Sequence, residues 1–442
     1  MEIMRKCVSV LMCKSKIRVF THPHIQKFII VTAFVLLAGG LQAQSFTERA
    51  VELQIVQEYD HDTMQLAGTL TMPLGVEGKV PAVILITGSG AQNRDEELMG
   101  HRPFKVIAEY LSARGYAVLR CDDRGVGGST GDMAHATTLD FAQDVDHQLK
   151  YLQSPLSDLN IDPNRIFLFG HSEGATVAAI VAAERSLTLN PVAGVAMLGG
   201  AAVDGKTLLL QQNEEIFRLK GLEDSLVDRR LACMRELFNV CDTIFLGEGV
   251  DTVKTLNLAF RPLFKKHAEG LTKEQKQKVG LTTPECYGWA VTVATPWMRT
   301  FLSLDSAKYI ARMRCPLLAI GGEKDCQVPA ATNLSAIERV CNENNVPCRM
   351  VRLKDVNHLG QVCVTGSVDE YATLGQAPDD KVLEALVQWL DSIAKPGKRT
   401  QNYFPSRSKP PDFALFTSSL RQSFICLSSL LLHYFYTIKV SK

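Results

Sequence analysis

The chain of 442 residues is 46% hydrophobic and 21% charged, which is the composition of a folded protein with a large core rather than of a disordered one. Its formal net charge of +1 is unevenly spread, because basic residues gather in residues 1–27 and 395–442 and leave an acidic body between them. An acidic body is poorly suited to a phosphate backbone, so a nucleic-acid partner is not expected.

The first predicted element is a hydrophobic segment, residues 28–41, which reads FIIVTAFVLLAGGL. Lys27 precedes it and the small residue Ala43 follows it, the order found in a secretory signal peptide. A transmembrane helix needs about 20 apolar residues, which is more than this segment has. We therefore expect residues 1–43 to be a signal peptide and the protein to be secreted or periplasmic, without a stable membrane span in its core. An uncleaved N-terminal anchor is the alternative.

Eight strand-like segments follow, and the later ones are short, nearly continuous apolar runs that are typical of parallel strands buried on both faces. The first two alternate more between apolar and polar residues, which favours an antiparallel edge. Helical segments lie between the strands; in residues 139–152, for example, apolar residues recur at helical spacing, and Thr137 and Asp140 form a helix start. The predicted strands begin at Val51, Met64, Val80, Tyr116, Arg165, Val192, Cys315 and Cys348.

This alternation predicts an α/β fold with a doubly wound, mostly parallel sheet of eight strands. Residues 203–308 interrupt the alternation with a long stretch of helical character, and we interpret them as an inserted helical cap because they are too long for a simple crossover. Residues 44–202 and 309–394 then form the two parts of one core. Residues 395–442 are a basic, proline-rich linker and an apolar tail, to which no role is assigned.

The twelve cysteines show no C-x-x-C spacing, so no zinc site is predicted. Cys341 and Cys348 are candidates for a bridge in an oxidising compartment, and most of the others are expected to be buried apolar side chains. A glycine-rich segment, residues 124–131, follows a predicted strand but lacks the third glycine of a dinucleotide-binding motif. We expect neither a metal nor another cofactor.

The motif that carries chemistry is Gly-His-Ser-Glu-Gly at residues 170–174, which matches G-x-S-x-G. An apolar strand precedes it and a helix-forming segment follows it, which is the setting of a nucleophile elbow. Its glycines allow a tight turn that holds the oxygen of Ser172 at the end of the strand. A plain tight turn is the alternative interpretation.

A serine hydroxyl is a weak nucleophile and needs a base that is held by an acid. In sheets of this type the acid and then the histidine follow the serine in the chain, each beyond the carboxyl end of a strand. Asp325 and His358 occupy such positions, so we expect a Ser172–His358–Asp325 triad. Glu323 is the alternative acid, and a solvated loop residue is the alternative role of His358.

The negative charge that develops on the substrate oxygen requires backbone donors. We expect one of them to be the amide of Glu173, the residue after the nucleophile, whose side chain is expected to be structural. The other is expected to be the amide of Ser89 in the loop after the third strand, with the Gly88 amide as its rival.

Two further groups of residues have two interpretations each. Four residues at the end of the insertion either line a substrate pocket or belong to the core of the cap: Trp289, Trp297, Met298 and Phe301. Four charged residues in neighbouring loops either contact the substrate or form ion pairs that brace the loops: Arg94, Asp95, Asp123 and Arg124.

Five segments of this chain resemble the α/β-hydrolase superfamily, and more narrowly its secreted or periplasmic carboxylesterases related to the serine-aminopeptidase-like hydrolases. They are TGSGAQNRDE from Thr87, DDRGVGGSTG from Asp122, GHSEG from Gly170, GGEKDCQVP from Gly321 and VNHLGQ from Val356. The resemblance spans residues 80–390 and implies the same fold, the same triad and a helical cap. One departure is Thr87, which stands where many relatives have a histidine.

The motif and the resemblance together predict a serine hydrolase that cleaves carboxylic esters, such as small acyl or acetyl esters, through an acyl-enzyme intermediate. The expected partner is a small-molecule ester. A serine peptidase or another acyl transferase with the same triad is the first alternative. A catalytically inactive binding protein is the second, and the complete triad argues against it because inactive scaffolds usually lose one member.

Overall fold

The computed structural model describes residues 45–56, 63–156, 158–245 and 252–395. The predicted signal peptide lies outside these residues, as does all of the predicted tail after residue 395. None of the helices in the described ranges combines the length and the apolarity needed to cross a membrane.

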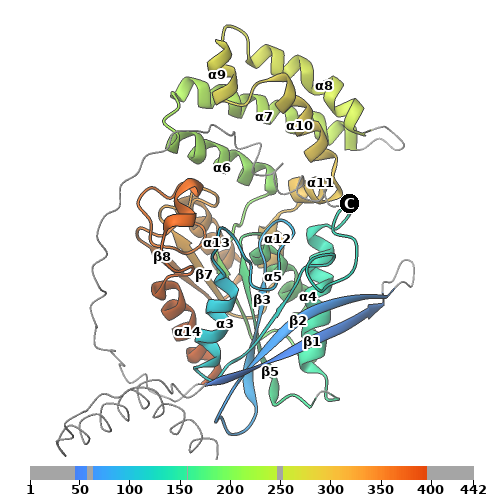
Figure 1. The fold of residues 1–442 in the computed structure, drawn as a ribbon, viewed down its shortest axis with the longest axis vertical. Helices are drawn as coiled ribbons and strands as arrows, with labels where there is room; N and C mark the ends of the chain where they lie inside the picture. Colours follow the sequence, from blue (N-terminus) through green and yellow to red (C-terminus); the bar gives the residue numbers. More distant parts are fainter. Residues whose placement is uncertain (1–44, 57–62, 157, 246–251, 396–442) are drawn as a thin grey trace, which may run out of the picture. The chain divides into compact units, whose positions relative to one another are not determined.

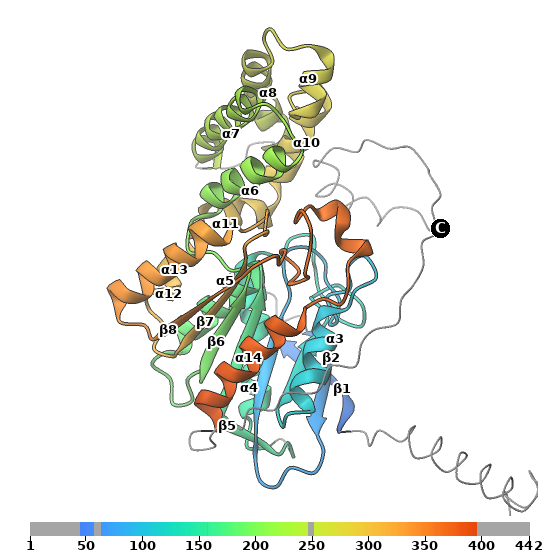
Figure 2. The ribbon, with the colours of Figure 1, turned by 90° about the vertical axis from the view of Figure 1, so that its left-hand side faces the viewer.

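An eight-stranded sheet forms the centre of the fold, in the order β1-β2-β4-β3-β5-β6-β7-β8 (Figures 1 and 2). The pairs β1–β2 and β2–β4 are antiparallel, and all other neighbours are parallel. The predicted α/β fold, with a mostly parallel sheet and an antiparallel edge, is confirmed. The strands are β1 (Phe46–Val56), β2 (Thr63–Pro73), β3 (Val80–Ile86), β4 (Ala117–Cys121), β5 (Ile161–His171), β6 (Gly194–Leu198), β7 (Leu317–Gly322) and β8 (Cys348–Leu353).

Two strands begin several residues earlier than the sequence pattern predicts. β1 starts at Phe46 rather than Val51, because its first residues pair with the end of β2 up to Pro73 although their side chains are mostly exposed. β5 starts at Ile161 rather than Arg165, where the chain pairs with Val80 of β3 before the register shifts. Backbone pairing extends both strands over residues that do not continue the apolar pattern of the strand.

Side chains of the sheet alternate between two hydrophobic layers, as those of β3 illustrate. Val83 and Leu85 belong to the layer beneath α3 and α14, whereas Ala82 and Ile84 belong to the layer beneath α4, α5 and α13 (Figure 2). α4 begins with the capping box predicted at Thr137 and Asp140. The helices are α3 (Pro103–Ser112), α4 (Thr138–Gln153), α5 (Glu173–Arg185), α13 (Ala330–Asn344) and α14 (Asp380–Ala394).

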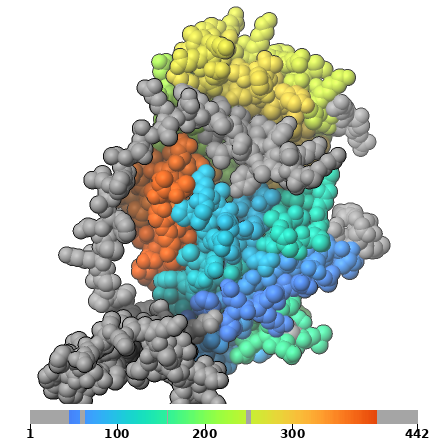
Figure 3. Space-filling view, in the orientation of Figure 1, coloured from blue at the N-terminus to red at the C-terminus, as the bar shows by residue number. Residues whose placement is uncertain are grey.

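The chain between β6 and β7 forms a helical insertion with a hydrophobic core of its own, in which Phe238, Leu256 and Phe260 are buried (yellow and light green in Figure 3). It leaves and rejoins the sheet at neighbouring points, because Asp204 and Asp305 form an isolated antiparallel bridge. The next helix, α12 (Ser306–Ile310), packs against α5 of the core around the sheet rather than against the helices of the insertion. The insertion helices are α6 (Gly205–Leu219), α7 (Asp224–Phe245), α8 (Thr252–His267), α9 (Lys273–Lys278), α10 (Thr283–Ala294) and α11 (Pro296–Ser303).

The nine cysteines of the described ranges are free thiols, and all but Cys348 are buried. Burial raises the pKa of Cys341 to about 12, and its thiol contacts that of Cys348. The two candidates for a bridge are therefore neighbours in the fold.

Candidate active site

The turn between β5 and α5 holds Ser172 in a strained conformation, with φ 54° and ψ −119°. A residue with a side chain pays on the order of 1–3 kcal/mol for such a conformation, which persists only where the surroundings enforce it. Here the Ser172 amide donates to the Leu198 carbonyl at 2.9 Å, at the end of the neighbouring strand β6. This is the predicted strand–turn–helix arrangement, and it holds Ser172 at the carboxyl end of the sheet.

The two glycines of G-x-S-x-G are required by space. A Cβ on Gly170 would lie 2.1 Å from the carbonyl oxygen of Gly174, and a Cβ on Gly174 would lie 2.2 Å from that of Ile86. Neither contact is possible for real atoms, so α5 can begin this close to β3 and β5 only with glycine at both positions.

Asp325 and His358 meet at the same edge of the sheet, after β7 and β8. His358 Nδ1 lies 2.8 Å from Asp325 Oδ2, and both side chains are buried. The other carboxylate oxygen, Oδ1, accepts the backbone N–H groups of Gln327 and Val328 at 2.9 and 2.8 Å. These bonds hold Asp325 ready to orient the imidazole ring.

The alternative acid, Glu323, does not meet the histidine. It is exposed, and its carboxylate lies 3.8 Å from the guanidinium of Arg352. The structure therefore pairs His358 with Asp325, and His358 is not a solvated loop residue.

Gly199 lies between the strand end that holds Ser172 and the imidazole of His358. It follows Leu198, whose carbonyl holds the Ser172 amide, and it has a φ of 60°. A Cβ at Gly199 would lie 2.9 Å from His358 Nδ1 and 3.3 Å from Asp325 Oδ2. The missing side chain is thus the space in which the imidazole lies.

The loop after β3 contains the two candidate amides for the oxyanion. The Gly88 amide donates to Glu96 Oε1 at 2.7 Å and is therefore occupied, which favours the Ser89 amide. Glu173 is the first residue of α5, so its amide has no acceptor within the helix. Gly88 packs tightly on the nucleophile, since a Cβ there would lie 3.2 Å from Ser172 Cβ.

Two residues near the nucleophile were missed by the sequence analysis. Glu96 also accepts from His171 Nδ1 at 2.9 Å, and His171 Nε2 lies 3.0 Å from the carbonyl oxygen of His358. Both side chains are buried. Their only signal in the sequence was membership of the segments TGSGAQNRDE and GHSEG, which does not say that the two meet.

The charged residues of the neighbouring loops brace those loops. Arg94 Nη2 lies 2.6 Å from Asp122 Oδ2, and Asp123 Oδ1 accepts from the Thr87 hydroxyl at 2.7 Å. The Thr87 side chain, the departure from the family pattern, is thereby used for loop structure. Asp95 pairs with Arg120 and Arg124 pairs with Asp144, each at 2.8 Å, and Arg124 also pairs with Asp140 at 3.4 Å.

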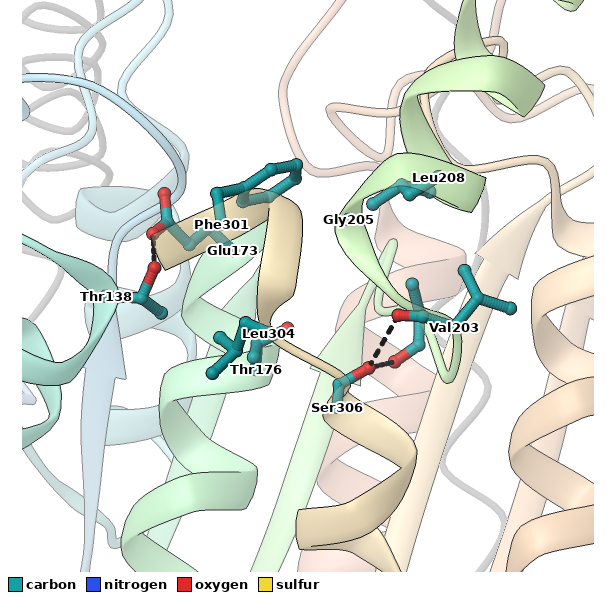
Figure 4. A pocket seen from close by; sticks show the side chains of 10 residues that line it. Thr138, Glu173, Thr176, Val203, Gly205, Leu208, Phe301, Leu304 and Ser306 are labelled. Atoms are coloured by element: carbon teal, nitrogen blue, oxygen red, sulfur yellow. Dashed lines mark hydrogen bonds between the residues drawn. The ribbon is translucent and has the colours of Figure 1, made fainter. Parts of the chain in front are cut away.

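The side chain of Glu173 connects the core with the insertion. Its Oε1 accepts from Thr138 Oγ1 at 2.6 Å (Figure 4). The carboxylate also accepts from Trp297 Nε1 at 2.9 Å and from the Ser89 side chain. Burial raises the pKa of Glu173 although these three donors lower it. The structural role expected for this side chain thus includes a contact with α11.

The four apolar residues at the end of the insertion are placed differently from one another. Met298 is buried in the insertion's own core, and the other three pack against that core half-buried. Trp297 also donates to Glu173, and its ring stacks on that of Phe301 with the ring centroids 5.3 Å apart. Phe301 also lines a cavity of about 20 Å³, enough for about one water molecule, between α5, α6 and α11 (Figure 4). Ser172 does not line this cavity. The insertion therefore reaches the neighbourhood of the nucleophile through Trp297 and Phe301.

The described ranges contain no group of three or more His, Cys, Asp or Glu side chains arranged to hold a metal ion. Residues 101–345 match the hydrolase family described as serine aminopeptidase, S33. The chain belongs to this family. Its predicted place among the α/β-hydrolases is thereby confirmed.

Several known proteins are similar to this S33 hydrolase in sequence or in structure. It is 25% identical to esterase EstD of Thermotoga maritima over 342 residues, which cover 77% of this chain and 69% of the relative. A similar solved structure is the α/β hydrolase GrgF from Penicillium sp. sh18, with 15% identity, 79% of this chain and 99% of that chain covered, and a TM-score of 0.45. For esterase B from Lactobacillus Rhamnosis these values are 15%, 84%, 96% and 0.43.

Proposed function

We propose that this S33 hydrolase cleaves carboxylic esters with small acyl groups through an acyl-enzyme intermediate on Ser172. The observation that carries the proposal is the hydrogen bond of 2.8 Å between His358 and Asp325, at the same sheet edge as the strained Ser172. The family and the similarity to an esterase support a carboxylesterase-like hydrolase.

In the proposed reaction His358 Nε2 takes the proton of the Ser172 hydroxyl as its oxygen attacks the ester carbonyl. Asp325 holds the tautomer in which Nδ1 carries a proton and stabilises the imidazolium that forms. The amides of Ser89 and Glu173 receive the negative charge of the tetrahedral intermediate. His358 then protonates the leaving alcohol, and water releases the acyl group by the same route.

The alternative is a serine peptidase or another acyl transferase with the same triad, and an exopeptidase of this kind needs a carboxylate or another charged residue that binds the substrate's amino terminus. Three carboxylates near the nucleophile are bound instead by groups of the protein itself. Glu96 accepts from Gly88 and His171, and Asp123 accepts from Thr87 and Gln92. Glu173, as described above, accepts from three neutral donors. This arrangement favours an ester over a peptide with a free amino terminus.

Two further expectations belong to this proposal. The insertion acts as a cap that governs acyl-chain preference, which is supported by the contact of Trp297 with the residue after the nucleophile. Secretion or periplasmic location is supported by the sequence of residues 1–43. N-terminal sequencing of the protein from its host is expected to begin at Gln44, and an intact N-terminus in the cytoplasm would contradict it.

The test is a panel of p-nitrophenyl acetate, p-nitrophenyl octanoate and an aminoacyl anilide. An esterase is expected to cleave the esters and leave the anilide. Ser172→Ala and His358→Ala should each lower kcat on the order of 10⁴-fold, and the double variant should be scarcely worse because the residues act as one unit. Circular dichroism checks that the variants fold. A folded Ser172→Ala enzyme with near wild-type turnover refutes the mechanism.

A further inference from the structure

The side chains of Glu96 and His171 form a buried pair that the proposed reaction does not use. Glu96 has a left-handed φ of 51° and is only 3% exposed. Its Oε1 lies 2.7 Å from the Gly88 amide and 2.9 Å from His171 Nδ1, while Oε2 is buried without a hydrogen-bond partner among the described residues. Burying a carboxylate costs free energy unless the group is paired, and the imidazole of His171 is the partner that lies opposite Glu96.

Both ring nitrogens of His171 face acceptors. Nδ1 faces the carboxylate of Glu96, and Nε2 faces the main-chain carbonyl of His358 at 3.0 Å. The His358 carbonyl has no proton to donate, so Nε2 must carry hydrogen, and an ionised Glu96 requires hydrogen on Nδ1 as well. With Glu96 ionised, both bonds form only when both nitrogens carry hydrogen, and His171 is then an imidazolium with Glu96 as its counterion.

The pair joins three separate parts of the site. Gly88 belongs to the loop that presents the Ser89 amide, His171 immediately precedes the nucleophile, and the His358 carbonyl belongs to the residue that carries the base. The rings of His171 and His358 are 4.8 Å apart between centroids. One ion pair thus links the oxyanion loop, the nucleophile elbow and the main chain of the base.

We propose that the Glu96–His171 pair is a positioning pair that sets the oxyanion loop and the main chain of His358 relative to Ser172, with both ring nitrogens of His171 protonated. The proposal rests on the proposed function for its effect on catalysis, but the protonation of His171 does not. Small displacements of reacting groups lower rates strongly, so losing this link is expected to reduce kcat more than substrate binding.

The electrostatics agree with this geometry. Burial alone lowers the pKa of His171, but the charge and the hydrogen bond of Glu96 raise it above its usual value, helped by the His358 carbonyl and by the charge of Asp325. The groups that face the ring are thus Glu96 from the loop after β3, and Asp325 and His358 from the loops after β7 and β8.

The test is Glu96→Gln, which keeps the size of the side chain and removes its charge. A neutral His171 keeps one ring N–H, which the Gln oxygen can accept, and loses the bond to the His358 carbonyl. We expect kcat for p-nitrophenyl acetate to fall about tenfold while KM changes by less than about twofold. Glu97→Gln is the matched control, because Glu97 is the next residue, is exposed and pairs with exposed Arg102 at 3.1 Å. It should leave both constants unchanged.

Nitrogen-15 NMR of the histidine rings provides the readout that a merely structural role would not move. At about pH 7.5, above the ordinary histidine pKa, both ring nitrogens of His171 should carry hydrogen in the wild-type protein and only one in Glu96→Gln. His171→Gln assigns the signals, and a Glu96→Gln/His171→Gln double variant should be no slower than the slower single variant because the two residues act together.

The outcomes separate the two proposals. A wild-type His171 with a single protonated nitrogen overturns the positioning pair, and so does a Glu96→Gln enzyme with the same kcat as Glu97→Gln. If Glu96→Gln does not fold, the wild-type spectrum still decides the protonation of His171. Ester hydrolysis by Ser172→Ala would instead remove the proposed function and leave the NMR result standing.

Discussion

Two buried carboxylates, Glu96 and Glu173, lie near the nucleophile and have different hydrogen-bond partners. On the side of the oxyanion loop, Glu96 faces the imidazole of His171 in a charged pair. Glu173 accepts instead from neutral donors of α4, the insertion and the oxyanion loop, namely Thr138, Trp297 and Ser89, and burial raises its pKa.

The different partners of Glu96 and Glu173 indicate different roles for the regions around them. A charged pair in a buried site is expensive to break, so the region around Glu96 is suited to holding the reacting groups in one geometry. A carboxyl group with neutral donors and a raised pKa can take up a proton, so the contact between Glu173 and Trp297 is the more adjustable of the two. We therefore expect changes near Glu96 and the triad to affect turnover, and changes at the insertion to affect substrate preference and stability.

The largest expected effect is at Asp325. Asp325→Asn removes the acceptor that holds His358 in its tautomer and should lower kcat by about 10⁴-fold. Glu323→Gln is the control, because Glu323 is exposed and faces Arg352 rather than the histidine. Steady-state kinetics with p-nitrophenyl acetate measure both variants. Loss in Glu323→Gln with retention in Asp325→Asn would move the acid by two residues.

A smaller but still strong effect is expected for Gly199→Ala. The added Cβ would lie 2.9 Å from His358 Nδ1 in a backbone conformation with φ 60°, so the imidazole must shift. Displacement of a reacting group by about 1 Å costs on the order of 10²-fold in rate. Gly375→Ala is the control, since its Cβ meets nothing within 4 Å. Equal turnover in the two variants would show that the imidazole is not held as described.

The side of the insertion is expected to respond through substrate preference. Trp297→Ala removes both the hydrogen bond to Glu173 and the stacking on Phe301, and should change the ratio of octanoate to acetate cleavage by about three- to tenfold. Trp289→Ala, at a residue packed against the insertion's own core, is the matched control and should alter stability without altering the ratio. Equal loss on both esters in Trp297→Ala would count against a role in the substrate pocket.

The smallest expected effect is a dependence of stability on pH. The folded state holds the proton of Glu173 more tightly than the unfolded state, because its folded pKa is raised above 4.5. The resulting stabilisation is fully present below pH 4.5 and is lost as the pH rises through the folded value. Wild type should therefore lose stability relative to Glu173→Gln as the pH rises above 4.5. Urea unfolding at several pH values measures it, and a constant difference would contradict the protonation of Glu173.

The sequence by itself determined the sheet and the positions of the principal site residues along the chain. The apolar runs predicted the strands, and parallel strands end at one edge, so residues after the fifth, seventh and eighth strands had to approach each other. Ser172, Asp325 and His358 could be predicted for this reason, and the glycines around Ser172 because close backbone approach leaves no room for a Cβ.

Only the tertiary structure decided which side chains meet. Glu323 and Asp325 are two residues apart, and which of them faces His358 depends on the turn after β7. The Gly88 amide is occupied by Glu96, and Trp297 reaches Glu173 while Met298 next to it turns into the insertion's core. Hydrophobic periodicity reports only the buried face of each element. Contacts between residues far apart in the chain depend on how the elements pack, and the pattern within a single segment does not predict that packing.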